Sequence, residues 1–179
     1  MLIQKADKRI RQYLHFLNKQ RYTRIIEPQF EVYETTTVHR KPPESATWSK
    51  ITLPHAYGKE WTSYWYRTKF TLPQEAAGRQ VFLRAVPNAD SLVFMNGKPI
   101  GALNPFHENI RLTESGKPGT EYQIHFESYA GHKFPGEHPF QGDSVILTLG
   151  AHIDDYPNLF RDAAIMVKNE AAYALYYDA

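Results

Sequence analysis

The sequence predicts a mainly β fold, a β-sandwich or jelly roll with an α-helix at each end. Short β-type runs separated by Pro, Gly and Asn fill residues 21–150, whereas apolar residues follow a helical period only before and after them. Aromatic residues make up 14% of the 179-residue chain, which favours a folded β-rich domain over disorder. The predicted units are an N-terminal helix at 1–20, a sandwich domain at 21–150 and a C-terminal linker helix at 151–179.

The N-terminal helix is predicted from apolar residues that share one face. These residues are Ile3, Ala6, Ile10, Tyr13, Leu14 and Leu17. Lysine and arginine residues lie mostly off this stripe, as on a docking helix whose opposite face is in water. A helix lying on a membrane surface is the alternative interpretation.

Six runs carry the clearest strand signals within the sandwich domain. They are 30–38, 64–72, 80–86, 91–95, 122–129 and 144–150. Within 64–72 the residues alternate, which places Trp65 on the face opposite Tyr66 and Phe70. Asn96-Gly97 predicts a two-residue type I′ hairpin, and Pro99 after it predicts that the returning strand lies at a sheet edge.

A second helix is predicted to begin near Pro157 and to continue to within a residue or two of the terminus. Its apolar residues are spread around more of the helix than one sandwich face should cover. We therefore expect this helix to pack on a further domain, or to mediate self-association when that domain is missing.

Composition excludes several function classes. The formal net charge is +2 with interspersed signs, so nothing indicates nucleic-acid binding. The absence of cysteine excludes disulfides, a thiol nucleophile and cysteine-ligated zinc. No run is long and apolar enough to span a membrane, and the N-terminus lacks the apolar core of a signal peptide, so a cytoplasmic location is expected.

The polar motifs do not form a catalytic constellation. His152 and Asp154 would share a strand face, but a zinc site needs three or four converging ligands, and helix capping by Asp154 or Asp155 is the preferred role. The loop that contains His132, Glu137 and His138 has no standard zinc spacing. The carboxylates of Asp90, Glu108, Glu121 and Glu127 are scattered, with nothing to pair them for glycoside hydrolysis. We therefore predict no catalytic residue, metal ligand or cofactor in this chain.

Sugar binding is the remaining candidate chemistry, since aromatic rings stack on the C–H faces of sugars. The candidate residues are Tyr57, Trp61, Trp65 and His132. The alternative for the aromatic residues is packing in the core or against another domain, which is the preferred interpretation in so aromatic a chain. His132 lies in a Gly/Pro-rich loop that could reach a ligand, a neighbouring domain, or neither.

The stretch YWYRTKFTLPQEAAGRQVFLRAVPNADSLVFMNGKPIG (64–101) resembles the non-catalytic jelly-roll domains of large retaining glycosidases, which have a galactose-binding-like fold. The leading helix RIRQYLHFLNKQRYTRIIE, the stretch FESYAGHKFPGEHP and the closing NEAAYALYYD resemble the N-terminal region of glycoside hydrolase family 38 α-mannosidases. In that family this region precedes an α/β-barrel, which carries zinc and a nucleophilic aspartate.

The resemblance implies an accessory domain that supports a catalytic barrel, with zinc expected in that barrel and not in this chain. The catalytic domain of the same polypeptide is then the expected partner, with carbohydrate as a possible further one. A free-standing carbohydrate-binding module is the alternative, and an enzyme in its own right is a third reading that the missing carboxylate and metal constellations oppose.

Overall fold

The computed structural model describes residues 2–59, 61–130 and 158–178. The predicted strand at 144–150 and the residues His132, Glu137, His138, His152, Asp154 and Asp155 lie outside the described residues. Two helices, twelve strands and one short 3-10 helix are described. In chain order they are α1 (Leu2–Gln20), β1 (Tyr22–Ile26), β2 (Phe30–Thr35), β3 (Ser49–Ile51), β4 (His55–Tyr57), β5 (Ser63–Thr71), η1 (Gln74–Ala76), β6 (Val81–Ala85), β7 (Ser91–Met95), β8 (Lys98–Leu103), β9 (Asn109–Thr113), β10 (Glu121–Tyr129), β11 (Asn158–Phe160), β12 (Ala163–Lys168) and α2 (Glu170–Asp178).

Two antiparallel sheets form the sandwich, as the alternating runs predict. The six-stranded sheet has the order β3-β2-β5-β10-β7-β8, and the four-stranded sheet has the order β1-β12-β6-β9. A third, two-stranded sheet pairs β11 with β4. β5 and β10 pair over nine residues, from Ser63–Tyr129 to Thr71–Glu121, and form the centre of the larger sheet.

Aromatic rings fill the space between the sheets. The ring centroids of Tyr66 and Phe126, on the two central strands, are 4.9 Å apart, and Phe160 on β11 meets Tyr66 at 5.0 Å. Phe30 at the start of β2 lies 5.1 Å from Phe160. These rings are buried. The alternating residues of β5 that include Tyr66 and Phe70 therefore face the core between the sheets, as the alternation predicts.

The Asn96-Gly97 hairpin is confirmed. Both residues have positive φ angles, of 49° and 79°, as a type I′ turn requires. Asn96 also accepts a hydrogen bond at its Oδ1 from the Gln123 N–H at 2.9 Å, which ties the turn to β10. The strand with Pro99, β8, lies at the edge of its sheet, as predicted.

The predicted C-terminal helix is wrong over residues 158–168. These residues form β11 and β12, and β12 lies inside the four-stranded sheet between β1 and β6. The apolar run from Ala163 to Val167 is buried on both faces of the sheet, and such a run fits a helix or a strand equally well by periodicity. The sandwich therefore extends to Lys168, and the helix begins only at Glu170.

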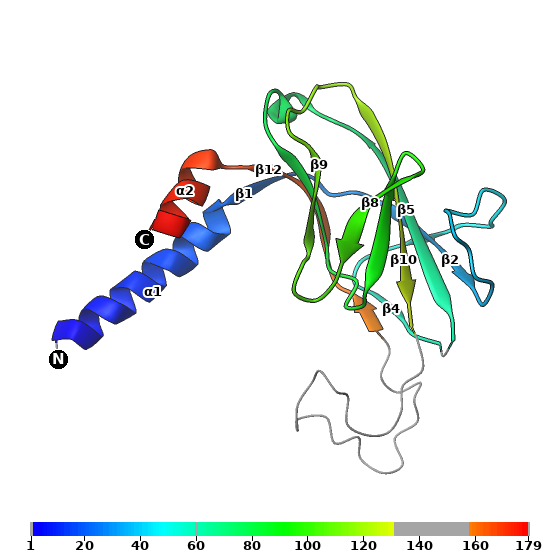
Figure 1. The fold of residues 1–179 in the computed structure, drawn as a ribbon, viewed down its shortest axis with the longest axis horizontal. Helices are drawn as coiled ribbons and strands as arrows, with labels where there is room; N and C mark the ends of the chain where they lie inside the picture. Colours follow the sequence, from blue (N-terminus) through cyan, green and yellow to red (C-terminus); the bar gives the residue numbers. More distant parts are fainter. Residues whose placement is uncertain (1, 60, 131–157, 179) are drawn as a thin grey trace, which may run out of the picture.

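α1 projects away from the sandwich, and α2 packs beside the C-terminal part of α1 (Figure 1). Asn169 caps α2, since its Oδ1 accepts a hydrogen bond from the Ala172 N–H at 3.2 Å. Arg21, between α1 and β1, donates to the Tyr177 hydroxyl at 3.0 Å and lies 4.5 Å from the Tyr176 ring centroid. We call α1 and α2 together the helical arm. No described helix is both long and apolar enough to cross a membrane.

Candidate functional site

The four residues predicted to bind sugar do not form one exposed surface. Tyr57 is 4% exposed and donates its hydroxyl proton to the Pro87 carbonyl at 2.7 Å, and burial raises the pKa of this hydroxyl far above its ordinary value. Trp65 is fully buried. Trp61 is 58% exposed, and His132 lies outside the described residues. Tyr57 and Trp65 are therefore packing residues, because no sugar can reach their rings in this structure.

Trp65 belongs to an aromatic layer on the outer face of the six-stranded sheet. Its ring lies 5.7 Å from that of Phe94 on β7 and 6.4 Å from that of His39, in the loop at 36–48. Trp48, at the end of the same loop, lies 5.9 Å from His125 on β10. Burial, with a smaller contribution from the Arg67 charge, lowers the pKa of His125 below its ordinary value. The loop thus covers the face that alternation alone left open to solvent.

Arg67 marks the boundary between this aromatic layer and a polar region. Its Nε donates to the Glu31 carboxylate at 2.6 Å, and its guanidinium carbon lies 4.4 Å from the Trp48 ring centroid. Glu31 and Arg67 are also cross-strand partners and form the last pair of the β2–β5 ladder. The side chain is therefore held in place by a charge-assisted bond and by stacking.

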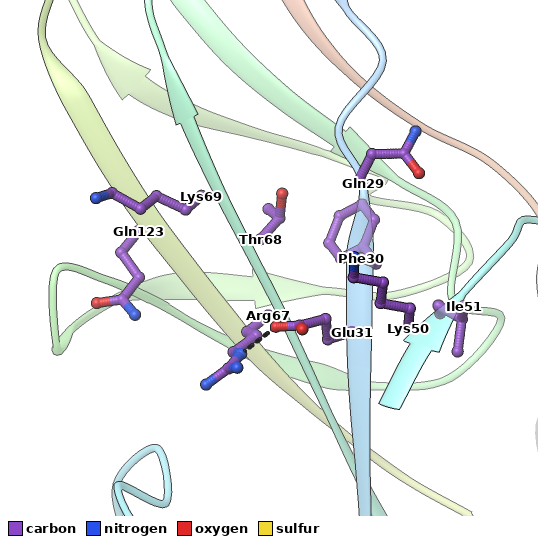
Figure 2. A pocket seen from close by; sticks show the side chains of 9 residues that line it. All are labelled: Gln29, Phe30, Glu31, Lys50, Ile51, Arg67, Thr68, Lys69 and Gln123. Carbon is purple, nitrogen blue, oxygen red and sulfur yellow. Dashed lines mark hydrogen bonds and ion pairs between the residues drawn. The ribbon is translucent and has the colours of Figure 1, made fainter. Parts of the chain in front are cut away.

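Beyond that pair, β2 and β5 separate and leave a cavity of about 230 Å³, which we call the β2–β5 slot. Figure 2 shows residues of β2 and β3 on one side, residues of β5 and β10 on the other, and Thr68 between them. The lining residues are Gln29, Phe30, Glu31, Lys50, Ile51, Arg67, Thr68, Lys69 and Gln123. A second cavity of about 290 Å³ shares Gln29, Phe30 and Ile51 with the slot, so the two lie next to each other.

Thr68 is the polar residue that sequence reasoning missed. It occupies an inward position on β5 between Tyr66 and Phe70, is 3% exposed, and its Oγ1 has no hydrogen-bond partner within the described part of the chain. The interruption of an apolar row by one threonine is the sequence signal that could have drawn attention to it.

An ionic network lies on the other sheet, near the second cavity. Asp162 accepts bonds from Arg24 and Arg84, and Arg84 also donates to Glu108 at 2.6 Å. Burial acts to raise the pKa of Asp162, but the Arg24 bond and the charges of both arginines outweigh it and hold that pKa below its ordinary value. The network joins β1, β6 and the residues just before β12, so it stabilises the four-stranded sheet.

The described residues contain no cluster of side chains that could hold a metal ion. No group of three or more His, Asp or Glu side chains converges within residues 2–59, 61–130 and 158–178. Glu108 and Glu121, two of the four carboxylates considered for hydrolysis, form ion pairs with Arg84 and Lys69. The β2–β5 slot, which combines a cavity with charged and polar side chains, is the clearest candidate binding site in the described structure.

Comparison with known proteins agrees with this architecture. Residues 26–156 match the family described as "Alpha-mannosidase, jelly roll domain". No curated protein matches the chain in sequence. Among solved structures, a calcium-binding mutant of Bacteroides uniformis beta-glucuronidase 2 is 18% identical, with a TM-score of 0.52, and the match covers 82% of this chain and 18% of that one.

Two structures of the Ruminococcus gnavus beta-glucuronidase are also similar. The complex with D-glucuronic acid is 14% identical with a TM-score of 0.43, and the complex with N1-substituted uronic isofagomine is 15% identical with a TM-score of 0.44. Each match covers 60% of this chain and 22% of that chain, so the chain spans about a fifth of the length of these relatives. The likeness to the Bacteroides enzyme shows the fold, and the family match over 26–156 shows the family. The chain belongs to the α-mannosidase jelly-roll domain family.

Proposed function

We propose that this chain is a non-catalytic accessory domain of an α-mannosidase-like glycoside hydrolase and that its helical arm docks on the catalytic domain of the same polypeptide. The observation that carries the proposal is the apolar surface of the arm. α1 exposes Ile10, Tyr13 and Phe16, and α2 exposes Leu175 and Tyr177. Large apolar side chains gathered on one element typically mark an interface.

The apolar residues of the arm are only partly buried. Leu17 of α1 is buried, whereas Ile10, Tyr13 and Phe16 recur at intervals of three residues and are each about half exposed. α2 has no fully buried residue. Packing between the two helices thus uses only part of their apolar surface, and the remainder is available to a partner.

Zinc and the reacting carboxylates belong, in this proposal, to the catalytic domain. The jelly roll would act by holding that domain in place, and a cytoplasmic location remains part of the proposal, supported by a chain without cysteine. The ionic network at Asp162 stabilises the sandwich and takes no part in docking.

The arm can be tested in the longer polypeptide that carries this domain. We expect Phe16→Glu with Leu175→Glu to lower the thermal stability of the catalytic domain and its hydrolysis of aryl α-mannosides, because two charges would be placed in an apolar interface. Gln12→Glu with Gln20→Glu is the matched control, since it adds the same two charges at exposed polar positions of the arm. Unchanged stability and activity in the first variant would remove the docking role.

The same variants apply to the 179-residue chain alone. Without a partner domain, we expect the arm to associate with a second copy through its exposed apolar residues, and Phe16→Glu with Leu175→Glu to return the chain to a monomer. Sedimentation velocity at several concentrations measures this. A wild-type chain that stays monomeric at high concentration would contradict the self-association, but not the docking on a catalytic domain.

Carbohydrate contact is a second candidate function, favoured by the exposure of Trp61. A single half-exposed ring gains little beyond the cost of immobilising a sugar, so we expect neutral mannosides to bind weakly, at about millimolar concentration or above. Titration of mannose followed by Trp fluorescence, in the wild type and in Trp61→Ala, tests this candidate.

A further inference from the structure

We propose that the β2–β5 slot binds an acidic monosaccharide, which is a sugar ring carrying a carboxylate or a phosphate group. This inference concerns the described residues of the sandwich and is independent of any docking by the helical arm.

The slot is a consequence of strand pairing. The β2–β5 ladder runs from Thr35–Ser63 to Glu31–Arg67 and then stops. Phe30 continues by pairing with Ile51 of β3, whereas Thr68 to Thr71 continue by pairing with β10. The two halves of the sheet therefore part at this point, and the opening is flanked by side chains of four strands.

Thr68 gives the slot a polar group that lacks a partner. A buried hydroxyl without a hydrogen bond costs roughly 1–3 kcal/mol, so such groups are rare in folded proteins. Thr68 lines the slot and is 3% exposed, and its buried Oγ1 has no partner among the described residues. A hydroxyl group of a sugar entering the slot could donate to or accept from this Oγ1.

The charges around the slot favour an anion. Three cationic side chains and one carboxylate line it. The Arg67 guanidinium is held by Glu31, and Lys69 Nζ lies 3.1 Å from a Glu121 carboxylate oxygen. Lys50 has no ion-pair partner in the described part of the chain, so its ammonium group is available to a ligand. An acidic substituent near Lys50 would complete the pairing of charges.

The remaining lining suits a small ring. Phe30 and Ile51 provide apolar surface, and the amides of Gln29 and Gln123 can donate to and accept from ring hydroxyls (Figure 2). The volume of about 230 Å³ lies below the roughly 300–1,000 Å³ of pockets for drug-sized ligands, so one sugar unit is the expected size. Apolar surface, amide groups and an unpaired cation in one slot together indicate a sugar acid or sugar phosphate.

The test compares ligands that share one ring. Mannose, mannuronate, mannose 6-phosphate and inorganic phosphate are titrated into the full 179-residue chain by calorimetry and by NMR amide shifts. We expect mannuronate, mannose 6-phosphate or both to bind saturably, and mannose and inorganic phosphate to bind at least about tenfold more weakly. The tighter of the two acidic sugars identifies the acidic group that the slot prefers.

Two variants assign the binding to the slot. Lys50→Gln should weaken the preferred acidic sugar about tenfold, because it removes the unpaired charge. Thr68→Val should weaken it about fivefold yet leave the thermal stability of the free chain unchanged or raised, because an unpartnered hydroxyl is replaced by a methyl group of similar shape. Lys98→Gln, on the edge strand β8 of the same sheet, is the matched control and should bind like the wild type.

The outcomes that overturn the proposal are distinct. Equal affinity for inorganic phosphate and mannose 6-phosphate would show an anion site without sugar recognition. Equal loss in Lys50→Gln and Lys98→Gln would show non-specific charge attraction. Unchanged affinity in Thr68→Val, or saturable binding of neither acidic sugar, would show that the slot is not the site.

Discussion

Among single residues, Trp65 illustrates how the six-stranded sheet buries side chains on both faces. Its neighbours Tyr64 and Tyr66 face the core, whereas Trp65 itself lies under the loop at 36–48, beside His39 and Phe94. A fully buried indole removes a large apolar area from water. The outer layer therefore contributes to stability as the inner core does.

We expect Trp65→Ala to reduce the free energy of unfolding by about 3–5 kcal/mol, the usual cost of emptying a buried aromatic site. Phe106→Ala is the control, because that ring is 91% exposed and its loss should change stability little. Urea denaturation followed by circular dichroism measures both. A Trp65→Ala variant as stable as Phe106→Ala would mean that the loop does not cover this face in solution.

Asp162 is a second single residue of interest, because its contribution to the free energy of unfolding depends on pH. Its pKa is lower in the folded chain than in the unfolded chain, so its stabilising effect is complete above the ordinary value of about 3.9. The effect is lost as the pH falls from there through the lower folded-state pKa. We expect the wild type to be more stable than Asp162→Asn at neutral pH, and this difference to shrink on acidification.

Denaturant midpoints of both proteins between pH 7 and pH 2 test this expectation. Glu75→Gln, a change at an exposed carboxylate in the short helix η1, serves as the control for general effects of charge. A constant difference between wild type and Asp162→Asn across the whole range would contradict the role of ionised Asp162.

The sequence predicted which residues share a face, but not what covers that face. Alternation placed Trp65 opposite Tyr66 and Phe70, and the structure agrees. Whether Trp65 is exposed depends on the loop at 36–48, whose His39 lies against its ring, while Trp48 of the same loop lies against His125. Contacts of this kind have no local signal, which is why Tyr57 and Trp65 were candidates for sugar binding and proved to be packing residues.

Among the elements, β12 is the one whose type the periodic pattern could not decide. Residues at spacings of three and four support a helix, but Ile165 and Val167 are β-branched and the run is apolar throughout. Pairing with β1 and β6 decided the outcome through distant contacts. The cap at Asn169, followed by Glu170, was the local signal for the true start of α2.

We expect Ile165→Ala to lower the stability of the whole sandwich by about 2–5 kcal/mol, because its side chain is fully buried between the sheets. A change in the helical arm, such as Leu175→Ala, should leave the main unfolding transition nearly unchanged, since Leu175 is half exposed. Calorimetry distinguishes the two. Loss of only a minor transition in Ile165→Ala would place this residue outside the cooperative unit.

At the scale of the whole molecule, the family match covers most of the sandwich but neither helix of the arm. The match over 26–156 begins at the end of β1 and ends before β11, so it includes neither α1 nor α2. The strand pattern in 64–101 was sufficient to indicate the fold, because its turns and alternation are local. The sequences of α1 and α2 can indicate that some of their apolar residues are exposed. They cannot identify the surface on which the arm is proposed to dock, because that surface belongs to other residues.

We expect the 179-residue chain alone not to hydrolyse aryl α-mannosides, with or without added zinc. The described residues bring together no metal-binding group, and Glu108 and Glu121 are held in ion pairs with Arg84 and Lys69. Release of nitrophenol from the aryl mannoside, measured after stringent purification and with a chelator-treated sample as the control, tests this. Zinc-dependent turnover that co-purifies with the chain would contradict the accessory role.

The position of β12 also dictates the order in which the domain can be completed during synthesis. All strands of the six-stranded sheet have been made once Tyr129 has left the ribosome, but β1 then still lacks its partner, because β12 ends only at Lys168. Until then the opposite sheet consists of the β6–β9 pair without β12 and β1, and it covers the core face of Tyr66 and Phe126 only in part. The nascent domain therefore lacks two of its twelve described strands during this interval, and its uncovered apolar surface and unpaired strand edges are then exposed to aggregation.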